Sequence, residues 1–343
     1  MISLVSTVLN DIEGLKVFFT QMEAQTRQPD EIVITDAGST DGSWELLQDY
    51  ALTGSILLRC HQELGCNVAR GRNLAIALTH HDLIASTDIG CSWDPEWLEE
   101  LTEPLVQNPQ TQAVMGSWDV PWDTLESDWA KVDYCLNRGL RFIATPKAHA
   151  SSRAIAYRKQ LWENIGGYPE DLTLAGDDMV FALLLHNTTD QIACAPIPRC
   201  HWQRPVTLRS FLKESRRNFR GGGEAGIWLD YGLLTGGRLL FDGLFSIGLF
   251  LLLLPHFKGM AVLLMVAASL SFILRMWRLL PAVKHFREQG GSGSWLKILI
   301  FEYLIKVSGV LGYWKGFLMG FNRCHQCRER LRQVKALESA QVI

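Results

Sequence analysis

The sequence of 343 residues has almost no excess charge, with 33 basic and 36 acidic residues giving a formal net charge of −3. It also lacks a basic stretch interleaved with aromatic side chains, which is the pattern typical of proteins that bind nucleic acid. Nucleic acid is therefore excluded as an expected substrate. Residues 1–8 also lack the basic start, long apolar centre and cleavage site of a secretory signal. We therefore expect the soluble part of the chain to stay in the cytoplasm.

The eight cysteines show no spacing typical of a disulfide framework or of a four-ligand zinc site. Most of them are expected to be reduced and packed. Cys324 and Cys327 stand three residues apart, a spacing that can bind a metal or exchange disulfides. No second ligand pair accompanies them, which favours packing over a metal site.

The apolar residues are distributed unevenly and predict two domains. Residues 1–230 have a mixed composition, and residues 231–343 contain long runs of Leu, Ile, Val, Phe and Met. The runs 239–254 and 260–274 are each somewhat short for a bilayer core of about 30 Å, but flanking residues can extend them. The break at residues 255–259 would make them a helical hairpin.

Basic residues follow the second apolar run, and they predict which side of the membrane the chain returns to. They are Arg275, Arg278, Lys284 and Arg287. By the positive-inside rule, they put the end of the hairpin on the cytoplasmic side. A third run, 295–321, carries several charges and is expected to lie at the membrane interface or to re-enter it. The alternative for the whole apolar part, residues 231–343, is a soluble hydrophobic dimer interface.

Strand-like and helix-like segments alternate through the first domain. Helical patterns follow Asn10 and cover residues 44–50, 67–78, 159–165 and 179–185, while short apolar β-branched runs occupy 2–9, 31–35, 55–59, 82–86, 113–118 and 154–158. This alternation predicts a parallel sheet with ligand sites outside the carboxyl ends of its strands. Trp118, Trp122 and Trp129 are expected to pack, although they could also line an acceptor groove.

Acidic residues stand at three predicted strand ends or turns: Asp36, Asp88 and the pair Asp177-Asp178. The pair closes the stretch 166–178, which could also be a solvated loop that caps the following helix. Carboxylates from separate strand ends that meet in one crevice could bind a nucleotide, hold a divalent cation and take a proton from a sugar acceptor.

With these motifs the first 230 residues resemble a family-two inverting glycosyltransferase of the GT-A fold. The matching stretches are 5–10, the turn 36–43, Gly71-Arg72-Asn73, Asp88-Ile89-Gly90 and Asp177-Asp178. The resemblance implies an α/β fold with a nucleotide-binding, mostly parallel central sheet flanked by helices, followed by an α-helical membrane-associated region.

The resemblance also implies roles for single residues. Asp36 would contact the nucleotide base, with Arg72 and Asn73 near the nucleotide. Asp88 stands where the family has its Asp-x-Asp metal motif, which implies Mn or Mg together with a UDP- or GDP-sugar donor. The second acid of the pair would be the catalytic base, which points to Asp178 with Asp177 as its neighbour.

Several positions depart from the family pattern. Gly90 replaces the second metal-binding Asp, so that a requirement for metal is in question, and Asp177 replaces the usual Glu. The Gln-x-x-Arg-Trp motif of processive polysaccharide synthases is absent, and residues 216–223 stand in its place. There, Arg217 and Arg220 on flexible glycine-rich backbone could close over a diphosphate. The alternative is a basic interfacial linker.

Two further positions resemble the family loosely. Arg153 and His201 correspond to residues near the donor pocket, and a His beside a Trp is more often packed than catalytic.

The expected function is that of a membrane-anchored, non-processive, hexosyltransferase-like glycosyltransferase. Its acceptor would be a hydroxyl group, on a lipid or a lipid-linked glycan, and its catalytic domain would lie on the cytoplasmic face of the cell inner membrane. Two alternatives remain: a processive polysaccharide synthase with a reduced membrane region, and a non-catalytic module that binds nucleotide sugars at the membrane.

Overall fold

The computed structural model describes residues 1–149, 151–173, 175–291 and 295–341. The chain forms two compact units, each assembled from segments that are distant in sequence. Unit 1 comprises Met1–Thr124, Leu140–Arg204 and the chain from Met319, and unit 2 comprises Leu125–Gly139 and Pro205–Leu318. The division into the domains 1–230 and 231–343, which the sequence suggests, stays a prediction.

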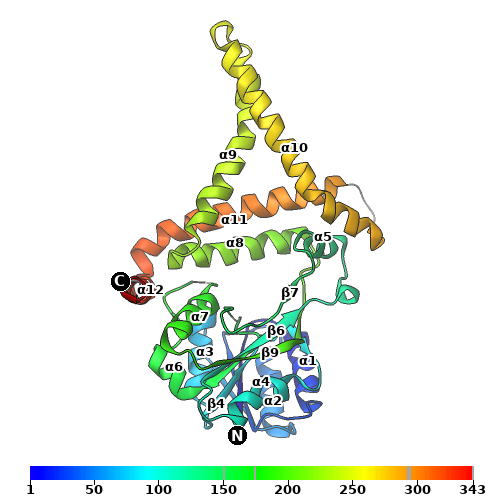
Figure 1. The fold of residues 1–343 in the computed structure, drawn as a ribbon. Coiled ribbons are helices and arrows are strands. Elements are labelled where there is room, and N and C mark those ends of the chain that lie inside the picture. Colours follow the sequence, from blue (N-terminus) through cyan, green and yellow to red (C-terminus); the bar gives the residue numbers. More distant parts are fainter. Residues whose placement is uncertain (150, 174, 292–294, 342–343) are drawn as a thin grey trace. The chain divides into compact units, whose positions relative to one another are not determined.

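In the described part of unit 1 the strands form a mixed sheet in the order β3-β2-β1-β4-β8-β6-β9-β5, with β7 paired to β6 (Figure 1). The strands are β1 (Ile2–Val8), β2 (Glu31–Asp36), β3 (Leu58–Gln62), β4 (Leu83–Ser86), β5 (Cys91–Trp93), β6 (Ala113–Asp119), β7 (Arg141–Phe142), β8 (Ile155–Arg158) and β9 (Ile192–Trp202). The first four strands of this order are parallel, as predicted. β8 runs antiparallel to both β4 and β6, and β5 runs antiparallel to β9, so the remainder of the sheet is mixed.

Helices flank this sheet and cover its apolar residues (Figure 1). They are α1 (Ile12–Glu23), α2 (Ser43–Thr53), α3 (Val68–Ala77), α4 (Trp97–Gln107), α6 (Lys159–Ile165) and α7 (Asp177–Thr188), and α12 (His325–Gln341) also belongs to unit 1. Every residue of β2 and β4 is buried, which is the pattern of strands covered on both faces. The predicted α/β fold is confirmed.

The parallel register places the carboxyl ends of three strands at one edge of the sheet. Val8 pairs with Asp36 across β1 and β2, and Val5 pairs with Ser86 across β1 and β4. Asp36 and the chain that leads from Ser86 to Asp88 therefore leave the sheet at the same edge. Asp36 and Asp88, two of the acidic positions recognised in the sequence, therefore lie at this edge because the strands point the same way.

Two predictions about segments were wrong or incomplete. Residues 216–223 are not a flexible loop, because they lie inside α8 (Leu208–Ala225). β9 was not predicted, since Pro196 and Pro198 argue against a strand. Both prolines fall where the β6–β9 register shifts, between Ala195 and Cys200, and so the ladder does not need their missing N–H groups.

Unit 2 is helical. Besides α8 it contains α5 (Asp128–Leu136), α9 (Leu229–Leu251), α10 (Lys258–Glu288) and most of α11 (Trp295–Arg323). The short 3₁₀ segment Pro255–Phe257 separates α9 from α10, which form the predicted hairpin (Figure 1). An ion pair between Asp242 and Arg275 joins these two helices.

Glycines bring α8 and α11 into contact. A Cβ on Gly223 would lie 2.2 Å from the Tyr313 carbonyl oxygen, and one on Gly316 would clash with the Arg220 carbonyl oxygen. Gly223 of α8 and Gly316 of α11 therefore allow the two helices to pack closely.

In the described residues, α9 and α10 are the two helices long and apolar enough to cross a membrane. Most of their apolar side chains are not buried within the protein, since only 12% and 11% of their apolar windows are covered. The third apolar run forms α11, which carries an i,i+4 ion pair between Glu302 and Lys306.

Candidate active site

The paired carboxylates lie in the first turn of α7, which begins at Asp177. Gly176 precedes the helix with a φ of 90°, a left-handed conformation that glycine adopts without steric cost. Asp178 Oδ1 accepts a hydrogen bond from the backbone N–H of Met179, in the same turn, at 2.8 Å. The interpretation as a helix cap therefore stays open for Asp178, whereas Asp177 also contacts Arg72 on another helix.

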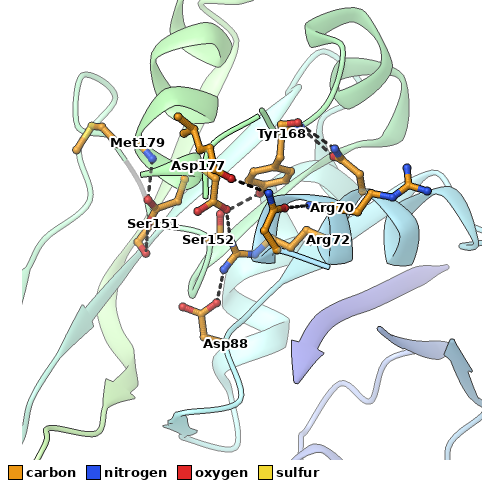
Figure 2. A network of polar contacts seen from close by, with 12 residues as sticks. Arg70, Arg72, Asp88, Ser151, Ser152, Tyr168, Asp177 and Met179 are labelled. Atoms are coloured by element: carbon orange, nitrogen blue, oxygen red, sulfur yellow. Dashed lines mark hydrogen bonds and ion pairs between the residues drawn. The ribbon is translucent and has the colours of Figure 1, made fainter. Parts of the chain in front are cut away.

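Arg72, on α3, bridges two of the predicted site carboxylates (Figure 2). Its Nη2 donates to Asp88 Oδ1 at 2.5 Å, and its Nη1 donates to Asp177 Oδ2. Burial lowers the pKa of this guanidinium, but the charges of Asp177 and Asp88 raise it by more, so that Arg72 stays charged. The two carboxylates come from positions 16 and 105 residues away in sequence and share this cation.

The environments of Asp177 and Asp178 differ. Burial raises the pKa of Asp177 to about 6, although the charge of Arg72 acts in the opposite direction. Asp178 is only partly buried and accepts hydrogen bonds from Ser151 Oγ at 3.0 Å and from its neighbour's backbone N–H at 2.8 Å. Asp177 is therefore tied to Arg72, and Asp178 is the member of the pair open to a ligand.

Each residue of the segment 151–153 forms a hydrogen bond with a different residue at or near the site. Ser151 contacts Asp178, Ser152 Oγ donates to Tyr168 Oη at 3.0 Å, and the Arg153 carbonyl oxygen accepts from Thr87 Oγ1 at 2.7 Å. Sequence reasoning missed Ser151, since a single serine in a loop carries no pattern that distinguishes it.

Arg153 is held by aromatic rings. Its guanidinium carbon lies 3.9 Å from the Trp202 ring centroid and 4.7 Å from that of Trp118. Within the described residues, its Nε and Nη1 are buried and have no hydrogen-bond partner. Thr87 Oγ1 binds the Arg153 carbonyl oxygen, which places the main chain of Arg153 beside the strand end that leads to Asp88.

Comparison with known proteins agrees with this arrangement. Residues 3–166 match the model described as "Glycosyl transferase family 2". This stretch, just under half of the chain, is therefore similar to glycosyl transferase family 2. The matched part includes Arg72, Asp88 and Arg153 and ends before the paired carboxylates of α7.

Two curated relatives come from Haloferax volcanii. The glucosyl-dolichyl phosphate glucuronosyltransferase is 23% identical over 46% of this chain and 52% of its own length. Glycosyltransferase AglE is 22% identical over 66% of this chain and 74% of its own length. The match thus spans only about half of the first relative.

Solved structures with a similar course of the chain include mannosyltransferase PcManGT from Pyrobaculum calidifontis, with a TM-score of 0.48, 16% identity and coverage of 93% of this chain and 83% of that chain. TarS 1-349 from S. aureus has a TM-score of 0.46, 12% identity and coverage of 92% and 90%. Because both TM-scores are below 0.5, the fold assignment rests on the strand order and the family match.

Asp36 is fully buried at the end of β2. It accepts hydrogen bonds from Gln62 Nε2 at 2.8 Å and from the backbone N–H groups of Gly38 and Ser39 at 3.0 Å. These bonds fix the turn that follows the strand. Gln62, at the end of β3, was not recognised in the sequence as a neighbour of Asp36.

Asn73 supports the fold around the site. Its side chain accepts from Tyr168 N at 2.9 Å and from Trp162 Nε1 at 3.1 Å, and it donates to the Tyr168 carbonyl oxygen at 2.9 Å. These bonds hold the turn that leads toward α7. A direct contact of Asn73 with the nucleotide stays a prediction.

The two arginines predicted to bind a diphosphate lie in unit 2, whereas the other predicted site residues lie in unit 1. Arg217 is exposed on α8, and Arg220 Nε donates to Glu224 Oε1 at 2.8 Å. Their role toward the donor stays a prediction.

His201 is held between two carboxylates. Nδ1 lies 2.6 Å from Asp119 Oδ1, and Nε2 lies 3.1 Å from Asp94 Oδ1. The hydrogen bond to Asp119, together with Asp94, raises the pKa of His201 despite its partial burial. Both ring nitrogens are engaged, which agrees with a packed histidine.

The cysteines of the 324–327 motif are packed as predicted. Both are fully buried; Cys324 Sγ donates to the Asp171 carbonyl oxygen, and Cys327 N donates to Asp171 Oδ2, each at 3.0 Å. Burial raises the pKa of Cys327 to about 12, which keeps the thiol protonated. In the part of the chain that the structure describes, no group of three or more potential ligands forms a metal site.

Asp88, the residue predicted to hold a divalent cation, accepts a hydrogen bond from Arg72 through Oδ1. The space where a Cβ of Gly90 would lie is open, with no atom within 4 Å. One carboxylate is compatible with Mg²⁺, which often binds one or two carboxylates and takes its other ligands from water and substrate phosphates. The residues therefore fit a cation that arrives with a nucleotide diphosphate, and Asp88 would hold it.

Proposed function

We propose that this chain is an inverting glycosyltransferase that moves a sugar from a nucleotide-sugar donor to a hydroxyl group of a lipid-linked acceptor. The observation that carries this proposal is the partly exposed carboxylate of Asp178 beside the Asp88–Arg72–Asp177 network, in a chain whose residues 3–166 match glycosyl transferase family 2.

In this proposal Asp178 is the general base. Its carboxylate takes the proton of the acceptor hydroxyl, and the oxygen attacks the anomeric carbon of the donor sugar. The bond from that carbon to the diphosphate breaks as the new bond forms on the opposite face, which inverts the configuration. The nucleoside diphosphate leaves with the bonding electrons, and Asp178 passes its proton to water.

The neighbouring residues position this base. Arg72 fixes Asp177 and with it the first turn of α7, while Ser151 orients the Asp178 carboxylate. Two groups would lie near the diphosphate: Arg153, and Asp88 with a bound Mn or Mg. The cation would offset the charge that develops on the leaving group. Asp36 would contact the base of the nucleotide.

The proposed acceptor and location rest on different observations. One relative is named a glucosyl-dolichyl phosphate glucuronosyltransferase, a name that supports a sugar on a lipid phosphate as the acceptor. α9 and α10 support a membrane-anchored enzyme. By the positive-inside rule we propose that the family 2 domain faces the cytoplasm at the cell inner membrane.

The test is release of nucleotide from a panel of UDP- and GDP-sugars by the full chain with membrane lipids, with and without Mn²⁺ or Mg²⁺. We expect Asp178→Asn to lower turnover by about 10²–10⁴-fold, the usual contribution of a general base, with nucleotide affinity unchanged. Asp190→Asn, an exposed aspartate just beyond α7, is the matched control and should retain activity.

Wild-type turnover by Asp178→Asn would refute the role of this residue. A chain that binds nucleotide but turns over no donor would instead be a non-catalytic nucleotide-sugar module. The anomeric configuration of the product, determined by NMR, tests inversion.

A further inference from the structure

Unit 2 contains a cavity of about 310 Å³ between the end of α5 and the second half of α10. Its apolar wall includes Leu279, Pro281 and Ala282, two of which are buried. Its basic residues are Arg138, Arg278 and His285, and no Asp or Glu is among the residues that line it. The cavity thus combines an apolar wall with a cationic rim.

The two arginines are available to a ligand. Both are exposed, and within the described residues neither forms an ion pair or a side-chain hydrogen bond. Arg138 also has a φ of 56°, in the left-handed region that a non-glycine residue seldom occupies. Residues held in such sparsely populated conformations cluster at ligand-binding positions. Arginine side chains bind phosphate in a bidentate manner, which suits an anionic headgroup.

The position of the cavity along α10 indicates the kind of ligand. The helix begins at Lys258, and at 1.5 Å per residue a bilayer core of about 30 Å is crossed in about 20 residues. A spanning α10 would therefore leave the core near Arg278, at the depth of lipid phosphates. The preceding residue, Trp277, is 70% exposed, as expected of an aromatic side chain at a membrane interface.

We propose that this cavity binds the phosphate group of a membrane lipid, with Arg138 and Arg278 holding the phosphate and the wall formed by Leu279 and Ala282 holding the start of the lipid chain. This site goes beyond the proposed transfer reaction and does not depend on it. Lipid binding tests the site, whereas nucleotide release tests the enzyme, so the failure of one is distinguishable from the failure of the other.

The experiment is a native mass spectrometry titration of the full chain in detergent with phosphatidic acid, with the matching diacylglycerol and with inorganic phosphate. We expect Arg138→Gln/Arg278→Gln to weaken phosphatidic acid binding at least about 10-fold, because two charge-assisted contacts are lost. The control, Lys284→Gln/Arg287→Gln, removes the same charge from α10 outside the cavity lining and should change affinity less than about twofold.

A second variant keeps the arginines and fills the cavity. Ala282→Phe should also weaken lipid binding, so the proposal stays testable if the double variant does not fold. Equal losses in the test and control pairs would indicate diffuse surface attraction and overturn the proposal. The proposal would also be overturned if diacylglycerol bound as tightly as phosphatidic acid. The same holds if inorganic phosphate bound as tightly as phosphatidic acid.

Discussion

Removal of Arg72 should destabilise the protein in a way that depends on pH. Arg72→Met keeps most of the side-chain volume and removes the cation that Asp177 and Asp88 share. Loss of one partner of a buried ion pair costs about 3–5 kcal/mol. Asp88 is partly exposed and can be solvated, so we expect most of this cost to come from Asp177, whose side chain is 8% exposed.

The pH dependence follows from the raised pKa of Asp177. That pKa is about 6 in the folded protein, against about 3.9 in an unfolded chain. A carboxyl with a raised pKa stabilises the fold fully below the unfolded value, and this contribution is lost as the pH rises through the folded value. Two pKa units correspond to about 3 kcal/mol. Without Arg72 the pKa of Asp177 should rise further, so the loss of folding stability with rising pH becomes larger and extends to higher pH.

The assay is thermal unfolding of the detergent-solubilised chain between pH 5 and pH 8. At pH 8 we expect Arg72→Met to lower Tm by about 10 °C, since 1 kcal/mol shifts Tm by about 2–4 °C in a domain of this size. At pH 5 Asp177 is protonated and the deficit should shrink. Adding Asp177→Asn should restore part of the stability at pH 8, because no unpaired buried charge remains.

Arg70→Met provides the matched control on the same helix. Arg70 is 42% exposed and pairs with surface carboxylates, so its loss should cost less than about 1 kcal/mol at any pH. An Arg72→Met deficit of equal size at pH 5 and pH 8, or no rescue by Asp177→Asn, would refute the proposed electrostatic role of Arg72.

Three further predictions concern packing and charge elsewhere. Gly223→Leu should separate α8 from α11 and lower Tm by several degrees. The control Gly237→Leu should not lower Tm, because no atom lies within 4 Å of the Gly237 Cβ position. Equal Tm values for the two variants would contradict the packing argument. Because the pKa of His201 is raised in the folded protein, its contribution to stability is fully present below the unfolded pKa and is lost as the pH rises through the folded pKa. His201→Gln should therefore flatten the dependence of Tm on pH between pH 6 and pH 9. An unchanged slope would contradict this prediction. Arg275→Leu should weaken the α9–α10 hairpin, because it leaves Asp242 unpaired. The double variant Arg275→Leu/Asp242→Leu should restore the stability of the hairpin, as measured by protease resistance in detergent. A double variant as sensitive to protease as the single one would show that the two residues are not coupled.

The fold of unit 1 could largely be predicted from local pattern. Buried β-branched runs and amphipathic helices have periods that are visible in the sequence, and parallel strands necessarily bring Asp36 and Asp88 to one edge. β9 escaped prediction because its prolines are tolerated only where the register with β6 shifts. That shift depends on the partner strand and cannot be seen in the sequence of β9 itself.

The sequence alone determined which residue types reach the candidate site: paired carboxylates before a helix and acids at strand ends. Only the tertiary structure decided how they are used, since Arg72 lies between Asp88 and Asp177 through contacts that span up to 105 residues. It also decided that Gly223 serves a close helix contact and not a flexible loop, because a Cβ there would lie 2.2 Å from the Tyr313 carbonyl oxygen of α11. Local preferences act over a few residues, whereas ion pairing, burial and helix contact depend on neighbours that only the folded chain supplies.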